Sequence, residues 1–358
     1  LNELRGKSVG KSVARHDARD KVTGAAKFVD DLQFRPVLYA KIFRSPYAHA
    51  RIISIDTSAA EQVPGVKTII TGRDCANSIG LYLVDKTVYA FDRVRFVGEP
   101  VAAVAADSIE AAEEAIKLIR VEFEELPGIF DPVSGLRAGG LFGTLDEAVS
   151  QAAHTKTDPA AYGTLLHENI ADYSCAPFIF PKPGTNISNH FKLRKGDMEK
   201  GFGEADVTVE NVFYVPHIQH CQIEPHAAIA HMDQAGKLTL WASSQSPNAV
   251  RKLIAEAFKL PLTKIRVITP YVGGGFGGKA GVTCEALVVP IAMRLPGYHI
   301  KLTLTREEVF QCTFVRQGLV AKIKTGAKAD GRIMAQEVDL YWDGGAYTEY
   351  GVNITRSG

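Results

Sequence analysis

The chain has 358 residues, of which 46% are hydrophobic and 23% charged, and its formal net charge is +1. This length is enough for two or three domains with cores of their own, and the composition is typical of a globular protein. A charge so close to zero gives no support to nucleic acid or an anionic membrane as a partner, and no apolar run reaches the length of a membrane span.

The five cysteines are scattered along the sequence. No two of them form a CxxC pair, so the chain shows no recognisable ligand set for zinc or an iron–sulfur cluster. An odd, scattered set is typical of reduced thiols, and the first residues contain no apolar segment of a secretion signal. These features predict a cytoplasmic protein.

Residues 1–135 predict one α/β unit. Runs rich in β-branched and aromatic or small apolar residues predict strands over 37–45, 50–58, 66–72 and 100–107. Asp107 precedes Glu110 by three residues, a capping-box spacing that predicts a helix from there to about 119. An alternating strand follows over 119–126. The strand, helix and returning strand predict at least one crossover unit.

Residues 136–190 show no sustained period and are rich in glycine and proline in places. We interpret them as a linker with a long excursion.

Residues 191–358 return to regular patterns. Ser246 is a suitable N-cap and Pro247 suits the first helical position. The residues after them share one apolar helical face, and a second helix is predicted over 281–295. The predicted apolar face consists of Val250, Leu253, Ile254, Ala257 and Phe258, and strands are predicted over 206–215, 236–244, 264–272, 300–305, 318–326 and 334–342.

The segment GGGFGGKA, residues 273–280, lies between a predicted strand and a predicted helix. Glycine permits close backbone approach at an entropic cost, and backbone N–H groups in this context can meet an anion or an oxo ligand. The segment lacks the spacing of a dinucleotide fingerprint and the ending of a P-loop. It is either a tight loop or a loop that cradles a ligand, with Phe276 as an apolar wall.

Several polar residues have both a structural and a functional interpretation. Gln245 follows a predicted strand. It is either an ordinary turn residue or a hydrogen-bond partner for a metal-bound oxygen. Arg316 is a solvated side chain or a guanidinium placed over a substrate carbonyl or carboxylate. Glu99 and Glu285 are interpreted as structural. Four histidines are also interpreted as structural, because their spacing matches no known metal site: His217, His220, His226 and His231.

Taken together, ordered motifs along nearly the whole chain resemble the molybdopterin-binding subunit of the xanthine dehydrogenase and aldehyde oxidoreductase family, the molybdenum hydroxylases. The motifs that carry the resemblance are RHDARDKVTGAAKFVDD, LYAKIFRSPYAHARI, VPGVKTIITGRD, RFVGEPVAAVAADS, VEFEELP, GDMEKGFGEADVTVENVF, IEPHAAIA, SSQSPNAVR, GGGFGGK and DGGAY.

The resemblance implies an α+β fold. An N-terminal α/β hammerhead domain would cover residues 1–135, and 136–190 would be a linker or excursion. Residues 191–358 would form the N-terminal part of a mixed α/β molybdopterin-binding domain. The implied enzyme oxidises an N-heteroaromatic or aldehyde substrate with oxygen derived from water. Its cofactor would be molybdopterin with molybdenum, the cytosine dinucleotide form being one option, and electrons would pass to Fe–S clusters and FAD on partner chains.

The resemblance also assigns roles to residues. Gln245 would approach the apical oxo group of molybdenum without ligating the metal. The cofactor would be lined by Gly274, Gly275, Phe276 and Gly277. Arg316 would orient the substrate. Purine-oxidising members carry a glutamate where this chain has Ala280, so the resemblance implies a substrate other than a purine.

Two further family features, an AFRGFG-like cofactor segment and a C-terminal glutamate that acts as general base, are not found in the sequence. We therefore expect no catalytic base among these 358 residues. The base is expected in a C-terminal half or on a second molybdopterin-domain chain, as in the split subunits of nicotinate dehydrogenase. The expected partners also include an Fe–S subunit and an FAD subunit. The alternative is a non-catalytic assembly or structural subunit that retains the fold.

Overall fold

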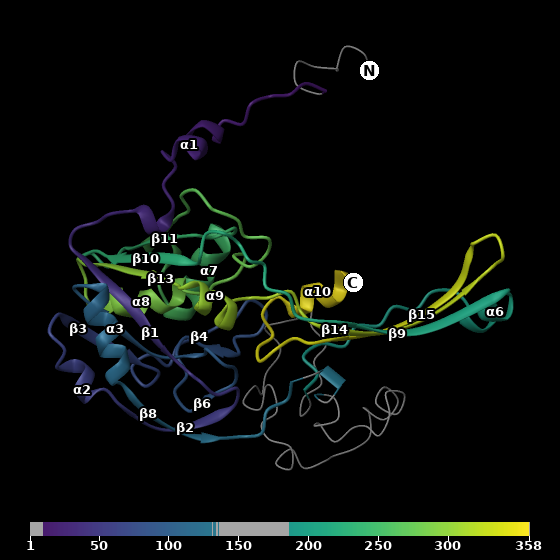
Figure 1. Cartoon of the computed structure of the whole chain (residues 1–358), viewed down its shortest axis with the longest axis horizontal. Coiled ribbons are helices and arrows are strands. Elements are labelled where there is room, and N and C mark those ends of the chain that lie inside the picture. Colours follow the sequence, from purple (N-terminus) through teal and green to yellow (C-terminus); the bar gives the residue numbers. More distant parts are fainter. Residues whose placement is uncertain (1–9, 131, 134, 136–185, 358) are drawn as a thin grey trace.

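The computed structural model describes residues 10–130, 132, 133, 135 and 186–357. Most of the predicted linker therefore lies outside the described residues. The largest unit is a seven-stranded sheet (Figure 1). In spatial order its strands are β12 (Ile265–Ile268), β11 (Leu238–Ala242), β10 (Ala227–Met232), β13 (His299–Thr303), β1 (Val37–Arg44), β7 (Pro100–Ala106) and β3 (Val66–Thr71).

This sheet combines strands from residues 1–135 with strands from residues 191–358. β1 runs parallel to β13, with Val37 opposite His299, so an early strand and a late strand pair directly. Every residue of β7 is buried, which indicates that both faces of the sheet are covered. Because side chains alternate along a strand, Ala103 and Ala105 join one core while Ala102 and Val104 join the other.

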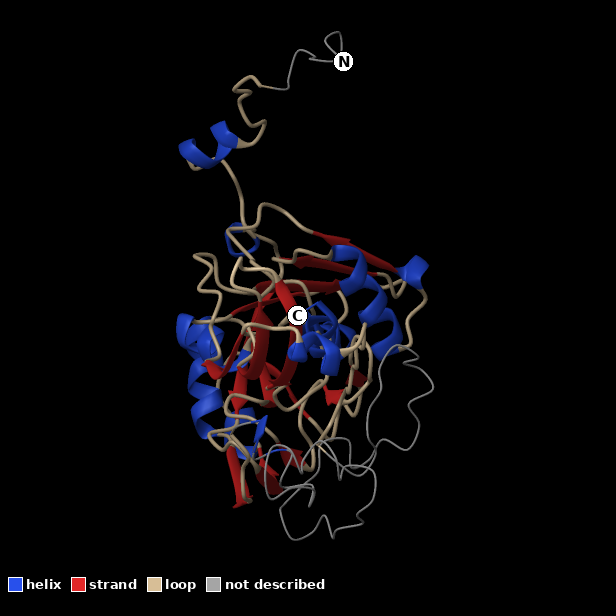
Figure 2. Cartoon of the chain, turned by 90° about the vertical axis from the view of Figure 1, so that its right-hand side faces the viewer, coloured by secondary structure: helices blue, strands red, loops and turns tan. Residues whose placement is uncertain are grey.

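Helices cover the two faces. Helices α7 (Pro247–Phe258) and α8 (Glu285–Arg294) pack on one face, and α2 (Ser58–Glu61) and α3 (Ile109–Leu118) pack on the other (Figures 1 and 2). The whole predicted apolar face of α7 is buried, so that prediction is confirmed.

Two smaller sheets complete the part below the main sheet in Figure 1. One pairs β6 (Arg93–Val94), β2 (Ala50–Asp56) and β8 (Arg120–Glu125), and the other pairs β4 (Ser78–Ile79) with β5 (Lys86–Thr87). The predicted crossover unit is wrong, because β8 pairs antiparallel with β2 and does not return to the sheet of β7. β8 is charged and exposed at alternate positions, which suits a half-exposed antiparallel sheet and not the fully buried one.

A three-stranded antiparallel sheet reaches away from the main body, on the right of Figure 1. It consists of β9 (Val207–Val215), β14 (Leu319–Ala327) and β15 (Ile333–Trp342), with β14 in the middle and α6 (Met198–Gly203) packed against it. These strands were predicted from the sequence, and their existence is confirmed.

The remaining short elements are α1 (Ala18–Thr23), η1 (Val29–Asp31), η3 (Leu262–Lys264), α9 (Arg306–Cys312) and α10 (Gly351–Ser357). None of the helices in the described part of the chain has the length and apolar character that crossing a membrane requires. The mixture of helices with parallel and antiparallel strands confirms the α+β class.

Candidate functional site

Two neighbouring parallel strands bring the glutamine and the glycine-rich segment together. β11 and β12 pair in parallel, with Trp241 opposite Ile268, so their carboxyl ends lie at the same edge of the sheet. Gln245 follows β11 and the glycine loop, residues 273–280, follows β12. The parallel pairing therefore places the two predicted site elements side by side.

Gln245 is bound to the far end of the glycine loop by three hydrogen bonds. Its backbone N–H donates to the carbonyl of Lys279 at 2.8 Å. Its side-chain Oε1 accepts from the N–H of Gly277 at 2.9 Å and from the N–H of Lys279 at 3.3 Å. These donors fix the amide with Oε1 toward the loop, and no described residue accepts from Nε2. The Nε2 group is thus left as a donor for a ligand.

The loop backbone adopts conformations that need glycine. Gly274 and Gly277 have φ of 101° and 97°, in the left-handed region that a side chain disfavours. At Gly275 a Cβ atom would lie 2.4 Å from Gln245 Oε1. Phe276 itself has φ of 52°, a conformation that costs a non-glycine residue roughly 1–2 kcal/mol.

The near end of the loop offers further donors. The backbone N–H groups of Gly274, Gly275 and Phe276 make no hydrogen bond within the described residues. Phe276 is 72% exposed. Successive free N–H groups with left-handed residues among them form the kind of concave donor set that binds anions and oxo groups. A cofactor with such a group therefore fits the residues present.

A buried ion pair holds the loop from behind. The side chain of Lys279 is fully buried, and its Nζ lies 2.7 Å from Glu224 Oε2. The same carboxylate oxygen accepts the N–H of Gly273 at 2.7 Å. One carboxylate thus joins both ends of the loop. The sequence analysis did not identify Glu224 or the role of Lys279. The position of Lys279 at the end of a closely packed glycine run could have indicated a buried lysine that needs an acidic partner.

A buried histidine supports the same loop. His226 Nε2 lies 2.9 Å from the carbonyl of Gly278, and Nδ1 lies 3.2 Å from Gln222 Nε2. Because a carbonyl only accepts, Nε2 carries the proton and Nδ1 accepts from the amide. Burial, with the positive charge of Lys279 as a smaller contribution, lowers the pKa of His226 to about 4. The ring is therefore neutral at pH 7.

The other three histidines take separate positions. His220 packs against Gly278 and lies 3.2 Å from the carbonyl of Phe314, His217 lies 3.6 Å from Asp343, and the His231 ring stacks on His299. Within the described residues, no three His, Cys, Asp or Glu side chains form a group that could hold a metal ion.

The two predicted substrate residues make different contacts. Ala280 ends the loop, and its carbonyl accepts from the Tyr350 hydroxyl at 3.0 Å. Arg316 pairs with Ile218 through both backbone groups, and its guanidinium donates to the carbonyl of Pro216 at 3.2 Å. Ala280 is thus bonded within the loop and to Tyr350, whereas Arg316 is exposed.

The two glutamates interpreted as structural are buried. Glu285 accepts from the N–H of Thr283 at 2.7 Å, at the start of α8. Glu99 accepts from the Tyr347 hydroxyl and from the N–H of Arg95. Burial raises the pKa of both carboxyl groups. The bond from Glu99 also joins the N-terminal region to the segment that carries Tyr350.

Both parts of the chain match known domain families. Residues 23–127 match the a/b hammerhead domain of aldehyde oxidase and xanthine dehydrogenase. Residues 179–358 match the molybdopterin cofactor-binding domain.

Similar proteins agree with these matches. The chain is 33% identical over 357 residues to the nicotinate dehydrogenase large molybdopterin subunit of Eubacterium barkeri, covering 98% of this chain and 74% of that protein. It is 30% identical to a xanthine dehydrogenase molybdenum-binding subunit of Escherichia coli O157:H7, covering 96% of this chain and 42% of that protein.

Among solved structures, the aldehyde oxidoreductase of Desulfovibrio gigas superposes with a TM-score of 0.78 at 27% identity. The match covers 97% of this chain and 36% of that chain, so the chain spans well under half the length of two of these three proteins. The paired domains, the fold and the loop geometry lead to one conclusion: the chain belongs to the xanthine dehydrogenase and aldehyde oxidoreductase family of molybdenum hydroxylases, as a molybdopterin-binding chain.

Proposed function

We propose that this chain holds the metal end of a molybdenum cofactor in a multi-subunit hydroxylase. The enzyme would oxidise an N-heteroaromatic or aldehyde substrate. When bound, the cofactor supplies the redox chemistry that transfers water-derived oxygen to the substrate carbon. This chain's own residues bind and orient the cofactor.

The observation that carries the proposal is the donor set at the edge of β11 and β12. The Gln245 amide has its Oε1 occupied by two loop N–H groups, which leaves its Nε2 as a donor without a partner among the described residues. The free N–H groups of Gly274, Gly275 and Phe276 add donors from the same loop. Gly275 keeps the space that the glutamine side chain needs. Preorganised donors of this kind stabilise charge that develops during a reaction.

The substrate proposal rests on Ala280. A methyl group at this position offers no hydrogen bond to the N–H edge of a purine. A buried polar group left unpaired costs about 1–3 kcal/mol, which would weaken purine binding by one to two orders of magnitude. We therefore propose nicotinate-like heteroaromatics or aldehydes as substrates, with Arg316 as the residue that orients them.

We further propose that the cofactor pocket is completed by residues outside this chain, which also supply the catalytic base, and that Fe–S and FAD centres lie on partner chains. Two relatives support a subunit role, since they are described as a large molybdopterin subunit and a molybdenum-binding subunit. The unpaired cysteines Cys75, Cys221, Cys284 and Cys312 support a cytoplasmic setting.

Elemental analysis of the assembled complex tests the cofactor assignment. We expect stoichiometric molybdenum in the wild type and in Gln245→Ala. The substitution should lower turnover by roughly 10² to 10³, because one preorganised donor is lost. Gln33→Ala, at an exposed position, is the matched control and should keep full turnover. A wild-type complex without molybdenum would identify the chain as a non-catalytic structural subunit.

A comparison of substrates tests the role of Ala280. We expect kcat/KM for nicotinate or an aromatic aldehyde to exceed that for xanthine, and Ala280→Glu to raise the xanthine value. Xanthine as the best wild-type substrate would overturn the substrate proposal. Unaltered kinetics in Arg316→Met would remove that arginine from the site.

A further inference from the structure

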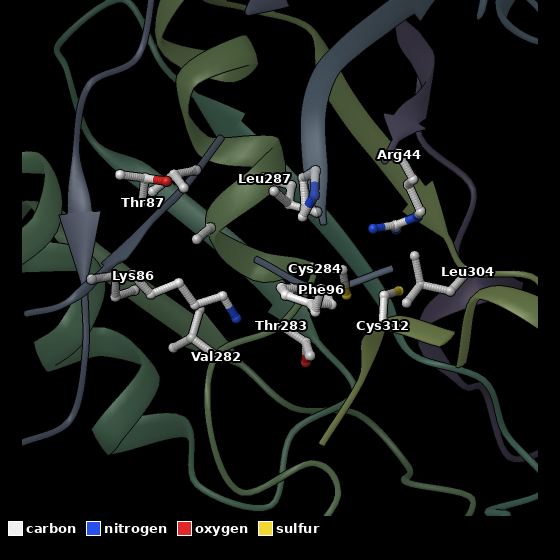
Figure 3. Close-up of a pocket in the computed structure, with 14 residues that line it drawn as sticks. Arg44, Lys86, Thr87, Phe96, Val282, Thr283, Cys284, Leu287, Leu304 and Cys312 are labelled. Atoms are coloured by element: carbon white, nitrogen blue, oxygen red, sulfur yellow. The ribbon is translucent and has the colours of Figure 1, made fainter. Parts of the chain in front are cut away.

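A small, partly open cavity lies at the N-terminal end of α8 (Figure 3). Its volume is about 20 Å³. The hammerhead region contributes one part of its wall, and the segment that follows the glycine loop contributes the other. The polar side chains that line it belong to Arg44, Lys86, Thr87, Thr283, Cys284 and Cys312, and the remaining lining residues are apolar.

Arg44 lines this cavity and has one buried nitrogen without a partner among the described residues. The side chain is only 10% exposed. Its Nε lies 2.8 Å from Glu308 Oε1, and Nη1 donates to the carbonyl of Gly98 at 3.1 Å. Nη2 is buried and has no hydrogen-bond partner among the described residues. Two fixed nitrogens hold the guanidinium in place, and Arg44 is one of the residues that line the cavity (Figure 3).

The other polar side chains of the lining can also donate hydrogen bonds. Lys86 extends its ammonium group toward the centre of the cavity (Figure 3), and no carboxylate is among the lining residues. Lys86 Nζ lies 3.6 Å from Glu349 Oε1, and burial raises the pKa of this carboxyl group. Burial also raises the pKa of Cys284 and Cys312, which keeps both thiols protonated. The positive end of the α8 dipole adds to the same potential.

The lining holds two cationic side chains and no carboxylate, and the buried Nη2 of Arg44 still needs an acceptor, so an anion is the favoured occupant. The volume exceeds the roughly 10–15 Å³ that one water needs and so admits one small occupant. We propose that the cavity binds one monatomic halide, with chloride as the physiological ion. The ion would join Arg44 and Lys86 to the start of α8 and so fix the chain that follows the glycine loop.

Crystals of the assembled enzyme grown with bromide in place of chloride test the proposal. We expect one anomalous peak in the cavity, within hydrogen-bond distance of Arg44 Nη2. The peak should be lost in Lys86→Met and in Arg44→Lys, which keeps the charge but removes Nη2. It should persist in Lys67→Met, a surface lysine paired with Asp107. A wild-type cavity without bromide, or a peak that survives both cavity substitutions, would overturn the proposal.

Thermal unfolding gives a readout independent of crystals and of activity. At constant ionic strength, replacing gluconate by bromide should raise the Tm of the wild type and of Lys67→Met in proportion to the logarithm of bromide concentration. Lys86→Met should show no such dependence. A wild-type Tm that does not respond to bromide would contradict halide binding.

Discussion

Gln245 takes its orientation from the loop beside it, and Gly275 gives it the space to do so. A methyl group at Gly275 would meet the Oε1, Cδ and Cγ atoms of Gln245 at 2.4, 2.5 and 2.7 Å. The obstructing group is a flexible side chain and not backbone. The conflict would therefore displace the glutamine more readily than it would unfold the domain.

Gly275→Ala should accordingly lower turnover by roughly 10² to 10³, as the loss of the oriented amide would, while the Tm changes little. Gly203→Ala is the matched control, because a Cβ there meets nothing within 4 Å and the backbone is helical. It should keep wild-type turnover. Equal turnover in the two variants would show that the position of Gln245 does not matter for the reaction.

His226 predicts a pH dependence of stability. Its pKa is lowered from 6.5 to about 4 in the folded chain, chiefly by burial. The unfolded chain therefore binds a proton between these pH values while the folded chain does not. The histidine destabilises the folded state progressively as pH falls from about 6.5 to about 4, by roughly 3 kcal/mol in total.

Denaturant unfolding of the wild type and of His226→Gln at pH 7, 6, 5 and 4 measures this effect. The wild type should lose stability relative to the variant as pH falls through this range. The difference in unfolding free energy between the two proteins isolates the contribution of His226. Glu99 and Glu285, whose pKa values are raised, stabilise the folded state as pH falls and do so in both proteins. A constant difference between the two proteins at all four values would contradict a neutral buried ring.

Helix α3 was predicted correctly, but its N-terminal boundary was not. The capping-box spacing pointed to Asp107, whereas the N-cap is Ser108, whose side chain accepts from the N–H of Ala111. Asp107 instead pairs with Lys67 on the surface. Ser246 occupies the N-cap of α7 as predicted, but its side chain makes no capping bond.

Replacing the two serines should therefore have unequal effects. Ser108→Ala should reduce the free energy of unfolding by about 1 kcal/mol, because an orphan N–H of the first turn loses its acceptor. Ser246→Ala should change it by only a few tenths of a kcal/mol, since no cap bond is lost. Denaturant unfolding measures both values, and a larger loss for Ser246→Ala would contradict the observed capping.

At the scale of the whole molecule, the seven-stranded sheet makes the two domain regions interdependent. Ile300 on β13 lies opposite Leu38 on β1, and both side chains are fully buried. Ile300→Ala should cost about 2–5 kcal/mol. The loss should reach β7 and β11 alike, although they belong to different regions of the sequence.

Hydrogen exchange followed strand by strand measures this coupling. Amide protection in β7 and β11 should fall by a common factor in Ile300→Ala, as expected for one cooperative unit. Ile333→Ala, at an exposed position on β15, should leave both strands unchanged. Loss of protection in β11 alone would show that the two regions unfold separately.

The sequence alone determined what depends on near neighbours in the chain. Strand periodicity, the apolar face of α7 and the glycine run next to a strand are local patterns, and the motif order identified the family. The predicted crossover unit is wrong because residues distant in the sequence decide which sheet a strand joins. In the structure β8 pairs with β2 and not with the sheet of β7.

Only the tertiary structure decided how the candidate site is held together. Glu224 and Lys279 are 55 positions apart, and Arg44 reaches Glu308 across 264. No local pattern encodes such pairs, because burial and charge compensation arise only when the sheet is assembled. The ion pair behind the loop, the neutral His226 ring and the donor-lined cavity therefore became visible only in three dimensions.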